Sequence, residues 1–549
     1  MKLGTAARKA NQGRTRLLPC PQVPSAAHLL LWPLERFPQK PRDSLAFLRW
    51  LSFFPRFFDH CTNGMGISCV VNGAVFLHSL RSLGKAAMMI IHAAKPLFAW
   101  DCLEDSPSLR TIRELLAALP DGKLLHSLHT ARGKGRDDYP VSVLWGVVVL
   151  RVALRHITTE AVLAELRRNE GLRRLIGIER EQGVPKKWNV SRFEEVLGSE
   201  PHRTLLKDVF NVLVQRLGVA VEELGRHAAA DATGLSARRK RADKAQKKEI
   251  EDGLPQASGG RKEYTDDQGN VTKVVEWFGF KLHLLVDVKN EVVLSYEVTD
   301  TKAGDGETLP ALLDQAEKNL FPGRIKHLAY DKAADSNDVH ALLSGKGITP
   351  LIQMRALWKE EHERMLPGHD GSSNVVYDED GTIYCYDKVS DPPVRHKMAY
   401  IGHEPQRGTL KYRCPAKHED WECPMSQVCN AGKSYGMTVR VPRDVDVRRF
   451  PALPRATKKF ERMYKGRTAV ERVNARFKVF WGVDDGNVSG SRRFVAQVGV
   501  VLAVHAAFAT LLAAAPRREG TLGKIQLNPI AQALRAAGKP KMLGAPIGA

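Results

Sequence analysis

The stretch from Tyr464 to Lys478 constrains the fold of this chain more than any other part of the sequence. If it forms an α-helix, which turns about 100° per residue, its polar residues gather within roughly 60° of one another on one face. Those polar residues are Tyr464, Arg467, Glu471 and Lys478. The opposite face is apolar and can pack against a core, because it carries Val470, Val473, Phe477 and Phe480. The polar face can therefore supply a metal-ligating carboxylate and hold phosphates beside it.

A simpler interpretation of the same stretch is an amphipathic surface helix. Arg467 and Glu471 would then form an ordinary i,i+4 pair, which stabilises a helix by roughly 0.2–0.5 kcal/mol. The rest of the sequence has to decide between the two interpretations.

The overall charge indicates a polyanionic partner. The chain has 549 residues, enough for two to four domains, and a formal net charge of +22. Nucleic acid is the partner that we expect first for a chain of such high positive charge, and an anionic membrane surface is the alternative. The eight cysteines include no CxxC pair, which argues against a secreted disulfide scaffold and favours a reducing cytoplasm.

One apolar segment, residues 498–515, just reaches the length needed to cross a bilayer. It is rich in alanine and is interrupted by His505 and Thr510. We expect a buried core helix and no membrane association; a membrane span is the alternative.

The two ends of the chain differ from the middle. Residues 1–87 mix proline, arginine and aromatic residues without a sustained period, so we expect a poorly ordered leader. The functional start would then be Met88 or Met89, and a chain that begins at Met88 should remain active. The alternative is a small additional module. Residues 517–549 are expected to form a weakly structured tail.

Residues 88–220 are expected to form an all-helical domain. Pro140 opens one helix, Thr158 or Thr159 caps another, and Asn189 or Ser191 caps a short basic one. Short basic helices joined by tight turns are typical of a helix-turn-helix DNA-binding domain. A plain helical bundle is an equal alternative.

Residues 221–354 predict an α/β core. A short strand around Asp231 is followed by a hairpin from Trp277 to Thr299, which turns at Lys289-Asn290. A helix, a strand that ends at Asp331, a second helix and a further strand follow. This order predicts helices packed on a mixed sheet.

Residues 355–457 lack this alternation of strands and helices, and they predict an inserted β-rich subdomain. Residues 458–516 are expected to be helical again. Four cysteines lie in the insertion, with three histidines nearby: Cys385, Cys414, Cys423, Cys429, His396, His403 and His418. Because their spacings are irregular, we interpret them as ordinary reduced cysteines; a structural zinc site is the alternative.

Three carboxylates are candidates for a shared metal site. Asp231 and Asp331 lie at or near the ends of apolar strands, and Glu471 lies on the helix described above. A charge beside a core is costly unless it is paired or ligates a metal. Together they could hold two Mg²⁺ ions about 3.5–4 Å apart for phosphoryl transfer. Each aspartate alone could be a turn or cap residue, and Asp335 competes with Asp331 for the same role.

The motifs resemble those of DDE transposases of bacterial insertion sequences, in the insertion-sequence-four group. The spacing Tyr-x2-Arg-x3-Glu-x6-Lys from Tyr464 to Lys478 matches that group's motif. Residues 331–336 (DKAADS) resemble its second-aspartate segment, usually Asp-Lys-Gly-Tyr-Asp-Ser, from which the two alanines depart. Residues 230–233 (ADAT) resemble the first-aspartate strand and residues 279–283 (GFKLH) the hairpin that follows. The likeness covers roughly residues 106–515.

The resemblance implies a ribonuclease-H-like core with the catalytic and metal-binding triad Asp231, Asp331 and Glu471. It implies cleavage at transposon ends and attack of the released 3′-hydroxyl on target DNA, with Tyr464, Arg467 and Lys478 on the phosphates. We therefore expect Mg²⁺, for which Mn²⁺ can substitute, double-stranded DNA as partner, a homodimer in the active complex, and a bacterial cytoplasmic location at the nucleoid. A metal-dependent nuclease of the same fold and an inactive DNA-binding descendant are the alternatives.

Overall fold

The computed structural model describes residues 107–133, 139–238, 244–266, 270–355, 358, 362–367, 374–485, 487–514 and 522. The chain divides after Ala86, and every described residue belongs to the part from Ala87 onward. The leader predicted for residues 1–87, with its start at Met88 or Met89, lies outside the described residues. So does the predicted tail, except for Leu522.

The first described part of the chain is helical. Its helices are α2 (Pro107–Ala118), α3 (Gly122–Arg132), α4 (Val141–Ala153), α5 (Thr159–Arg168), α6 (Glu170–Leu175), α7 (Lys187–Leu197) and α8 (His202–Ala220). The prediction of Thr158 as a cap is confirmed, because its side chain accepts a hydrogen bond from the Ala161 amide at the start of α5. The caps predicted at Asn189 or Ser191 are wrong. Helix α7 begins earlier, at Lys187, and its N-cap residue is Lys186, whose side chain makes no capping hydrogen bond.

Buried polar contacts accompany the apolar core of these helices. Trp145 is fully buried, and its indole Nε1 donates to Asp121 Oδ2 at 2.6 Å. Burial raises the pKa of Asp121 to about 6, although the Trp145 hydrogen bond acts in the opposite direction. Arg151 and Glu194 form an ion pair that is almost fully shielded from solvent. These contacts tie α3, α4 and α7 together.

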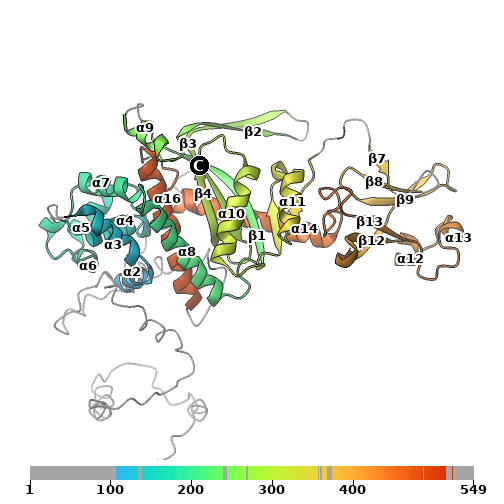
Figure 1. Cartoon of the computed structure of the whole chain (residues 1–549), viewed down its shortest axis with the longest axis horizontal. Coiled ribbons are helices and arrows are strands. Elements are labelled where there is room, and N and C mark those ends of the chain that lie inside the picture. The colour runs from blue at the N-terminus through green and yellow to red at the C-terminus, as the bar shows by residue number, and fades with distance from the viewer. Residues whose placement is uncertain are drawn as a thin grey trace, which may run out of the picture. The chain divides into compact units, whose positions relative to one another are not determined.

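A mixed six-stranded sheet follows (Figure 1). Its strands are β1 (His227–Ser236), β2 (Ser258–Thr265), β3 (Val271–Asp287), β4 (Val293–Thr299), β5 (His327–Tyr330) and β6 (Thr349–Ile352). The order is β2-β3-β1-β5-β6, with β4 paired to β3. Strand β1 is antiparallel to β3 and parallel to β5, and β5 is parallel to β6. The prediction of an α/β core around a mixed sheet is confirmed.

The predicted hairpin from Trp277 to Thr299 corresponds to β3 and β4. Its turn is fixed by Asp287, whose carboxylate accepts hydrogen bonds from the Asn290 amide at 2.6 Å and from the Gly225 amide at 2.7 Å. Strand β3 is much longer than the sequence indicated, because its first half pairs with β2. Strand β2 and the first half of β3 together form a two-stranded ribbon that extends from the sheet (Figure 1).

Helices cover both faces of the sheet. Helix α10 (Asp305–Asn319) packs on β3 and β4, and α11 (Asn337–Gly345) packs beside β6. His283 on β3 faces α10, where Thr308 contacts its Nδ1 at 3.0 Å. Because side chains alternate along a strand, and Ala232 is the partner of His283 in the register, Asp231 points to the other face.

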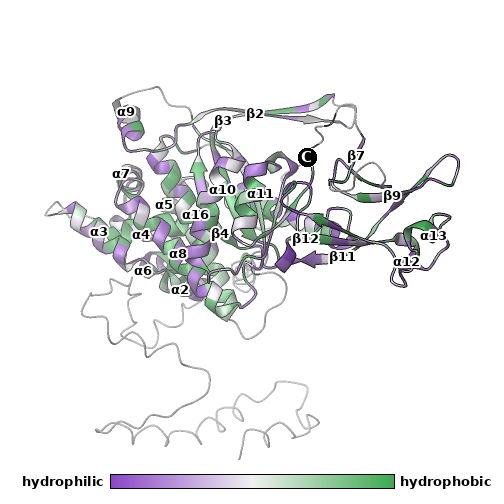
Figure 2. Cartoon of the chain, turned by 45° about the vertical axis from the view of Figure 1, so that its right-hand side comes forward, coloured by the Kyte–Doolittle hydropathy of each residue, from purple (hydrophilic) through white to green (hydrophobic). Residues whose placement is uncertain are grey.

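Helix α16 (Ser491–Ala514) is the longest apolar helix of the described chain and contacts α8, α7, α2 and α4. Figure 2 shows hydrophobic residues along most of its length. By length and composition alone it could cross a membrane, but 72% of its most apolar window is buried within the protein. Its packing therefore supports the prediction of a core helix.

The predicted insertion contains two small antiparallel sheets with a core of their own. One has the order β10-β9-β8-β7 and the other β11-β12-β13. The strands are β7 (Glu363–Met365), β8 (Val375–Asp378), β9 (Ile383–Asp387), β10 (Val394–Lys397), β11 (Ala399–Glu404), β12 (Thr409–Arg413) and β13 (Thr438–Pro442). Two short helices, α12 (Pro415–Glu419) and α13 (Ser426–Cys429), lie between β12 and β13. The β-rich character agrees with the sequence; the boundaries 355–457 stay a prediction.

Candidate active site

Asp231 and Asp331 lie at equivalent positions on neighbouring parallel strands. The register of β1 and β5 pairs Ala229 with Ala329, and each aspartate follows two residues later. Asp331 comes directly after the last residue of β5, Tyr330. Because β1 and β5 are parallel, Asp231 lies beside the carboxyl end of β5, where Asp331 follows. The expectation that Asp231 lies at or near a strand end is wrong, because β1 continues from Asp231 to Ser236.

The Asp231 carboxylate lies in a poorly solvated place. Burial raises its pKa to about 6, the charge of Asp305 adds to that rise, and Lys262 and Arg467 oppose it. Its Oδ2 atom accepts a hydrogen bond from the amide of Asn474 at 3.3 Å. A buried carboxylate that contacts a neutral donor favours the approach of a cation.

Arg467 forms an ion pair with Glu471 and lies near the other two predicted carboxylates. Its Nη1 atom lies 2.8 Å from Glu471 Oε1. Burial lowers the pKa of Arg467, but Glu471, Tyr464, Asp331 and Asp231 together outweigh burial and raise it overall. The guanidinium is therefore within electrostatic range of all three acids. The turn that carries it also contacts β1 and β5.

The helix that carries the motif is less regular than the sequence predicted. It consists of α14 (Lys458–Tyr464), a 3₁₀ turn (Lys465–Arg467), α15 (Thr468–Ala475) and a π-helical turn (Arg476–Phe480). Val470, Val473 and Phe477 are buried as expected. The prediction of one α-helical row is wrong, because the 3₁₀ and π turns change the angle per residue.

Lys478 lies in the π-helical turn, and its ammonium group is 3.4 Å from Asp484 Oδ2. Its ionic partner is therefore an acid that follows the helix, whereas Arg467 pairs with the predicted Glu471. Tyr464 stays near Arg467, whose guanidinium carbon is 6.0 Å from the phenol ring centre. Burial raises the pKa of Tyr464, and Arg467 opposes that rise.

Asp335, the competitor of Asp331, is engaged elsewhere. Its side chain is fully buried and lies 2.7 Å from Arg448 and 2.9 Å from His340 Nε2, with Arg455 at 3.6 Å. Burial alone would raise its pKa, but these partners hold the pKa far below its ordinary value. Asp335 therefore joins the sheet edge to the arginines that follow β13, and Asp331 is the more accessible of the two acids.

Two side chains near the site gave no clear signal in the sequence. Asn474 lies three residues after Glu471, so it shares the helix face that points to Asp231. Asp305 opens α10 and lies 2.6 Å from Lys281. It also contributes to the raised pKa of Asp231. The i,i+3 spacing from Glu471 could have indicated Asn474, whereas only the fold brings Asp305 near β1.

The donor chemistry fits a hard divalent cation, because Mg²⁺ and Mn²⁺ prefer carboxylate oxygens and water. In the described part of the chain, however, no group of three or more His, Cys, Asp or Glu side chains is already spaced to hold a metal ion. The Arg467–Glu471 pair engages Oε1 of Glu471, so a cation at this site would compete with Arg467 for that carboxylate.

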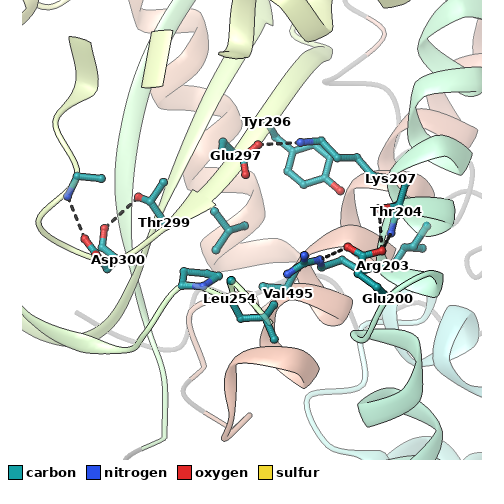
Figure 3. Close-up of a pocket in the computed structure, with 15 residues that line it drawn as sticks. Glu200, Arg203, Thr204, Lys207, Leu254, Tyr296, Glu297, Thr299, Asp300 and Val495 are labelled. Carbon is teal, nitrogen blue, oxygen red and sulfur yellow. Dashed lines mark hydrogen bonds and ion pairs between the residues drawn. The ribbon is translucent and has the colours of Figure 1, made fainter. Parts of the chain in front are cut away.

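A cavity of about 540 Å³ lies elsewhere, between α8, β4 and the loop at Leu254 (Figure 3). Four of its charged side chains pair with one another: Lys207 with Glu297 at 2.7 Å and Arg203 with Glu200 at 2.8 Å. None of the predicted site residues lines it. The cavity is thus distinct from the strand edge that carries Asp231 and Asp331.

Comparison with known protein families gives a match for most of this region. The family model described as the transposase DDE domain matches residues 222–506. The matched range contains every strand described here and all of the predicted site residues. A search among curated proteins found no match.

Proposed function

The chain belongs to the family of transposases with a DDE domain, and on that premise we propose that it cleaves DNA at the ends of an insertion sequence and transfers them to target DNA. Membership implies DNA transposition, action on DNA, and phosphodiester cleavage and transesterification in general. The proposal assigns these reactions to the strand edge that carries Asp231 and Asp331.

We propose a ribonuclease-H-like core of the insertion-sequence-four group. The supporting observation is the sheet order β4-β3-β1-β5-β6, in which three antiparallel strands are followed by two parallel ones. The Tyr464, Arg467, Glu471 and Lys478 spacing supports the group. The helices of residues 88–220 would then contact DNA, and two copies of the chain would act together in the bacterial nucleoid.

Asp231, Asp331 and Glu471 are the proposed ligands and catalytic acids. The equal register of Asp231 and Asp331 on β1 and β5 is the single observation that supports this most. Two Mg²⁺ or Mn²⁺ ions would supply an activated oxygen nucleophile and stabilise the leaving oxygen. The protein's part is to hold the acids at one edge and to keep Asp231 oriented through the Asn474 amide.

Arg467 has two roles in this proposal. Without metal, its guanidinium neutralises the neighbouring acids and pairs with Glu471. With the acids neutralised by cations, the same guanidinium is free to hold a DNA phosphate through two parallel hydrogen bonds. Tyr464 would support it, and Lys478 would contact a phosphate after it leaves Asp484.

An end-joining assay tests the proposal. The purified protein is given Mg²⁺, DNA that carries the inverted repeats flanking its gene, and a target plasmid. We expect nicked ends and joined products, both of which EDTA abolishes. Cut ends that are never joined would favour the nuclease alternative. Binding without cleavage would favour the inactive descendant, and absence of binding would contradict all three.

A further inference from the structure

The four cysteines of the insertion, far apart along the chain, lie in neighbouring elements of the structure. Cys385 lies on β9, Cys414 precedes α12, and Cys423 and Cys429 lie before and at the end of α13. All four are free thiols. They belong to three separate elements, so their proximity results from the fold and not from the spacing of the sequence.

Two asparagines show how closely the thiols approach. The Asn430 amide donates to Cys414 Sγ at 3.6 Å, and Asn430 directly follows Cys429. The Asn374 amide donates to Cys429 Sγ at 3.7 Å. Asn374 also precedes Val375, which is the cross-strand partner of Cys385. The two asparagines therefore connect Cys414 and Cys429 to the strand that pairs with Cys385.

Cys423 lies at the turn that opens α13. Its carbonyl oxygen accepts a hydrogen bond from the Ser426 amide at 2.8 Å. The Asn430 side-chain amide that donates to Cys414 also donates to Ser426 Oγ at 3.1 Å. Burial raises the pKa of both the Cys385 and the Cys423 thiols, and Cys414 and Cys429 contribute to both rises.

The segment that carries these thiols has little else to hold it in place. Between Lys417 and Gly436, only Asn430 and Gly436 itself are buried, and Val428 is 72% exposed. Helices α12 and α13 have five and four residues. Small structures with so little core are usually stabilised by disulfides or by a structural metal.

We propose that Cys385, Cys414, Cys423 and Cys429 form a structural zinc site that fixes the α12–α13 segment to strand β9. Four thiolates are a common ligand set for tetrahedral structural zinc. The Asn374 and Asn430 amides would then donate to zinc-bound thiolates, which accept hydrogen bonds better than neutral thiols do. The thiols have to draw together on binding, since no three of them are already spaced as ligands in the described chain.

His396 is the competing ligand, because it lies directly across from Cys385 on β10. Its ring packs against Trp421 with ring centres 4.8 Å apart. We therefore assign the site to the four sulfurs and leave His396 outside it.

The test is the metal content of the full-length chain, purified without chelators and measured by elemental mass spectrometry. We expect about one zinc ion per chain. Cys414→Ser with Cys429→Ser should lose it. The control, Cys20→Ser with Cys102→Ser, removes two thiols outside the insertion and should keep it, as should His396→Asn.

A second measurement does not depend on the folding of a variant. The wild-type chain is stripped of metal and titrated with Co²⁺, and we expect the charge-transfer absorption of a tetrahedral cobalt–thiolate site to saturate at about one equivalent. The proposal is wrong if the wild-type chain carries no zinc and gives no such absorption. It is also wrong if the Cys414 and Cys429 double variant keeps its zinc, or if His396→Asn loses it.

Discussion

Asp231 and Asp331 each lie two residues beyond the paired residues Ala229 and Ala329 of two adjacent parallel strands, which places Asp231 beside the carboxyl end of β5. This relationship turns two acids that are a hundred residues apart in the chain into neighbours. It also orients the helix of Glu471, because Asn474 on that helix donates to Asp231.

Removal of any one of the three acids should abolish cleavage. In Asp231→Asn, Asp331→Asn and Glu471→Gln the side chain keeps its size but loses the charge that a metal ion requires. We expect DNA cleavage to fall by at least about a thousandfold, the scale of a missing catalytic group. DNA binding, measured by gel shift, should be unchanged.

Asp338→Asn is the matched control for these variants, because Asp338 is an exposed acid on α11, seven residues after Asp331. It should cleave at the wild-type rate. Full activity in any of the three acid variants would show that the wrong carboxylate had been assigned.

Asp335→Asn should affect stability more than chemistry. The substitution leaves the buried guanidinium of Arg448 without its carboxylate partner, and breaking a buried ion pair costs roughly 3–5 kcal/mol. We expect the thermal unfolding midpoint to fall by roughly 5 °C or more, as measured by scanning fluorimetry. Asp331→Asn should leave the midpoint nearly unchanged; equal effects of the two variants would contradict their different roles.

Asn474→Ala should weaken metal-dependent activity without abolishing it. The variant loses the hydrogen bond that orients Asp231, and loss of such supporting partners typically costs about 10–100-fold in metal affinity or activity. We expect the Mg²⁺ concentration for half-maximal cleavage to rise. Asn337→Ala, at an exposed position on α11, serves as the control. If the Mg²⁺ concentration for half-maximal cleavage is unchanged in Asn474→Ala, Asn474 contributes to packing only and does not support the metal site.

The helical part of the chain offers a pH prediction through Asp121. Its pKa is about 6 in the folded chain and about 3.9 in the unfolded chain, so the folded state binds more protons between these values. Stability attributable to this group is therefore present below pH 4 and lost as pH rises through 6. Asp121→Asn should unfold at the wild-type temperature at pH 4 and several degrees higher at pH 7.5. If the unfolding temperatures of Asp121→Asn and the wild-type chain differ by the same amount at pH 4 and at pH 7.5, the raised pKa of Asp121 is refuted.

Periodicity and strand patterns were enough to predict the mixed sheet, its hairpin and the buried helix α16. Local rules sufficed there, because apolar runs and the Asp287 turn determine these elements. The same rules gave the Arg467–Glu471 pair, which depends on a spacing of four residues within one helical stretch. The apolar strand that ends before Asp331 favours this residue over Asp335 as a site residue, and that choice stays a prediction.

Other features depend on contacts that no local pattern contains. Lys478 was expected in the polar row, but 3₁₀ and π turns rotate it toward Asp484. The burial of Asp335 depends on Arg448, more than a hundred residues away. The cysteines of the insertion belong to three different elements, so their spacing along the sequence does not show how they lie in the fold.

The most direct test of the central claim is where a metal ion binds. Crystals of the full chain grown with Mn²⁺ can be measured at a wavelength where manganese scatters anomalously. We expect at least one anomalous peak about 2.1 Å from carboxylate oxygens of Asp231 and Asp331, with Glu471 turned away from Arg467 toward the same ion. A peak that involves neither aspartate, or a fully occupied manganese ion at another site only, would contradict the account.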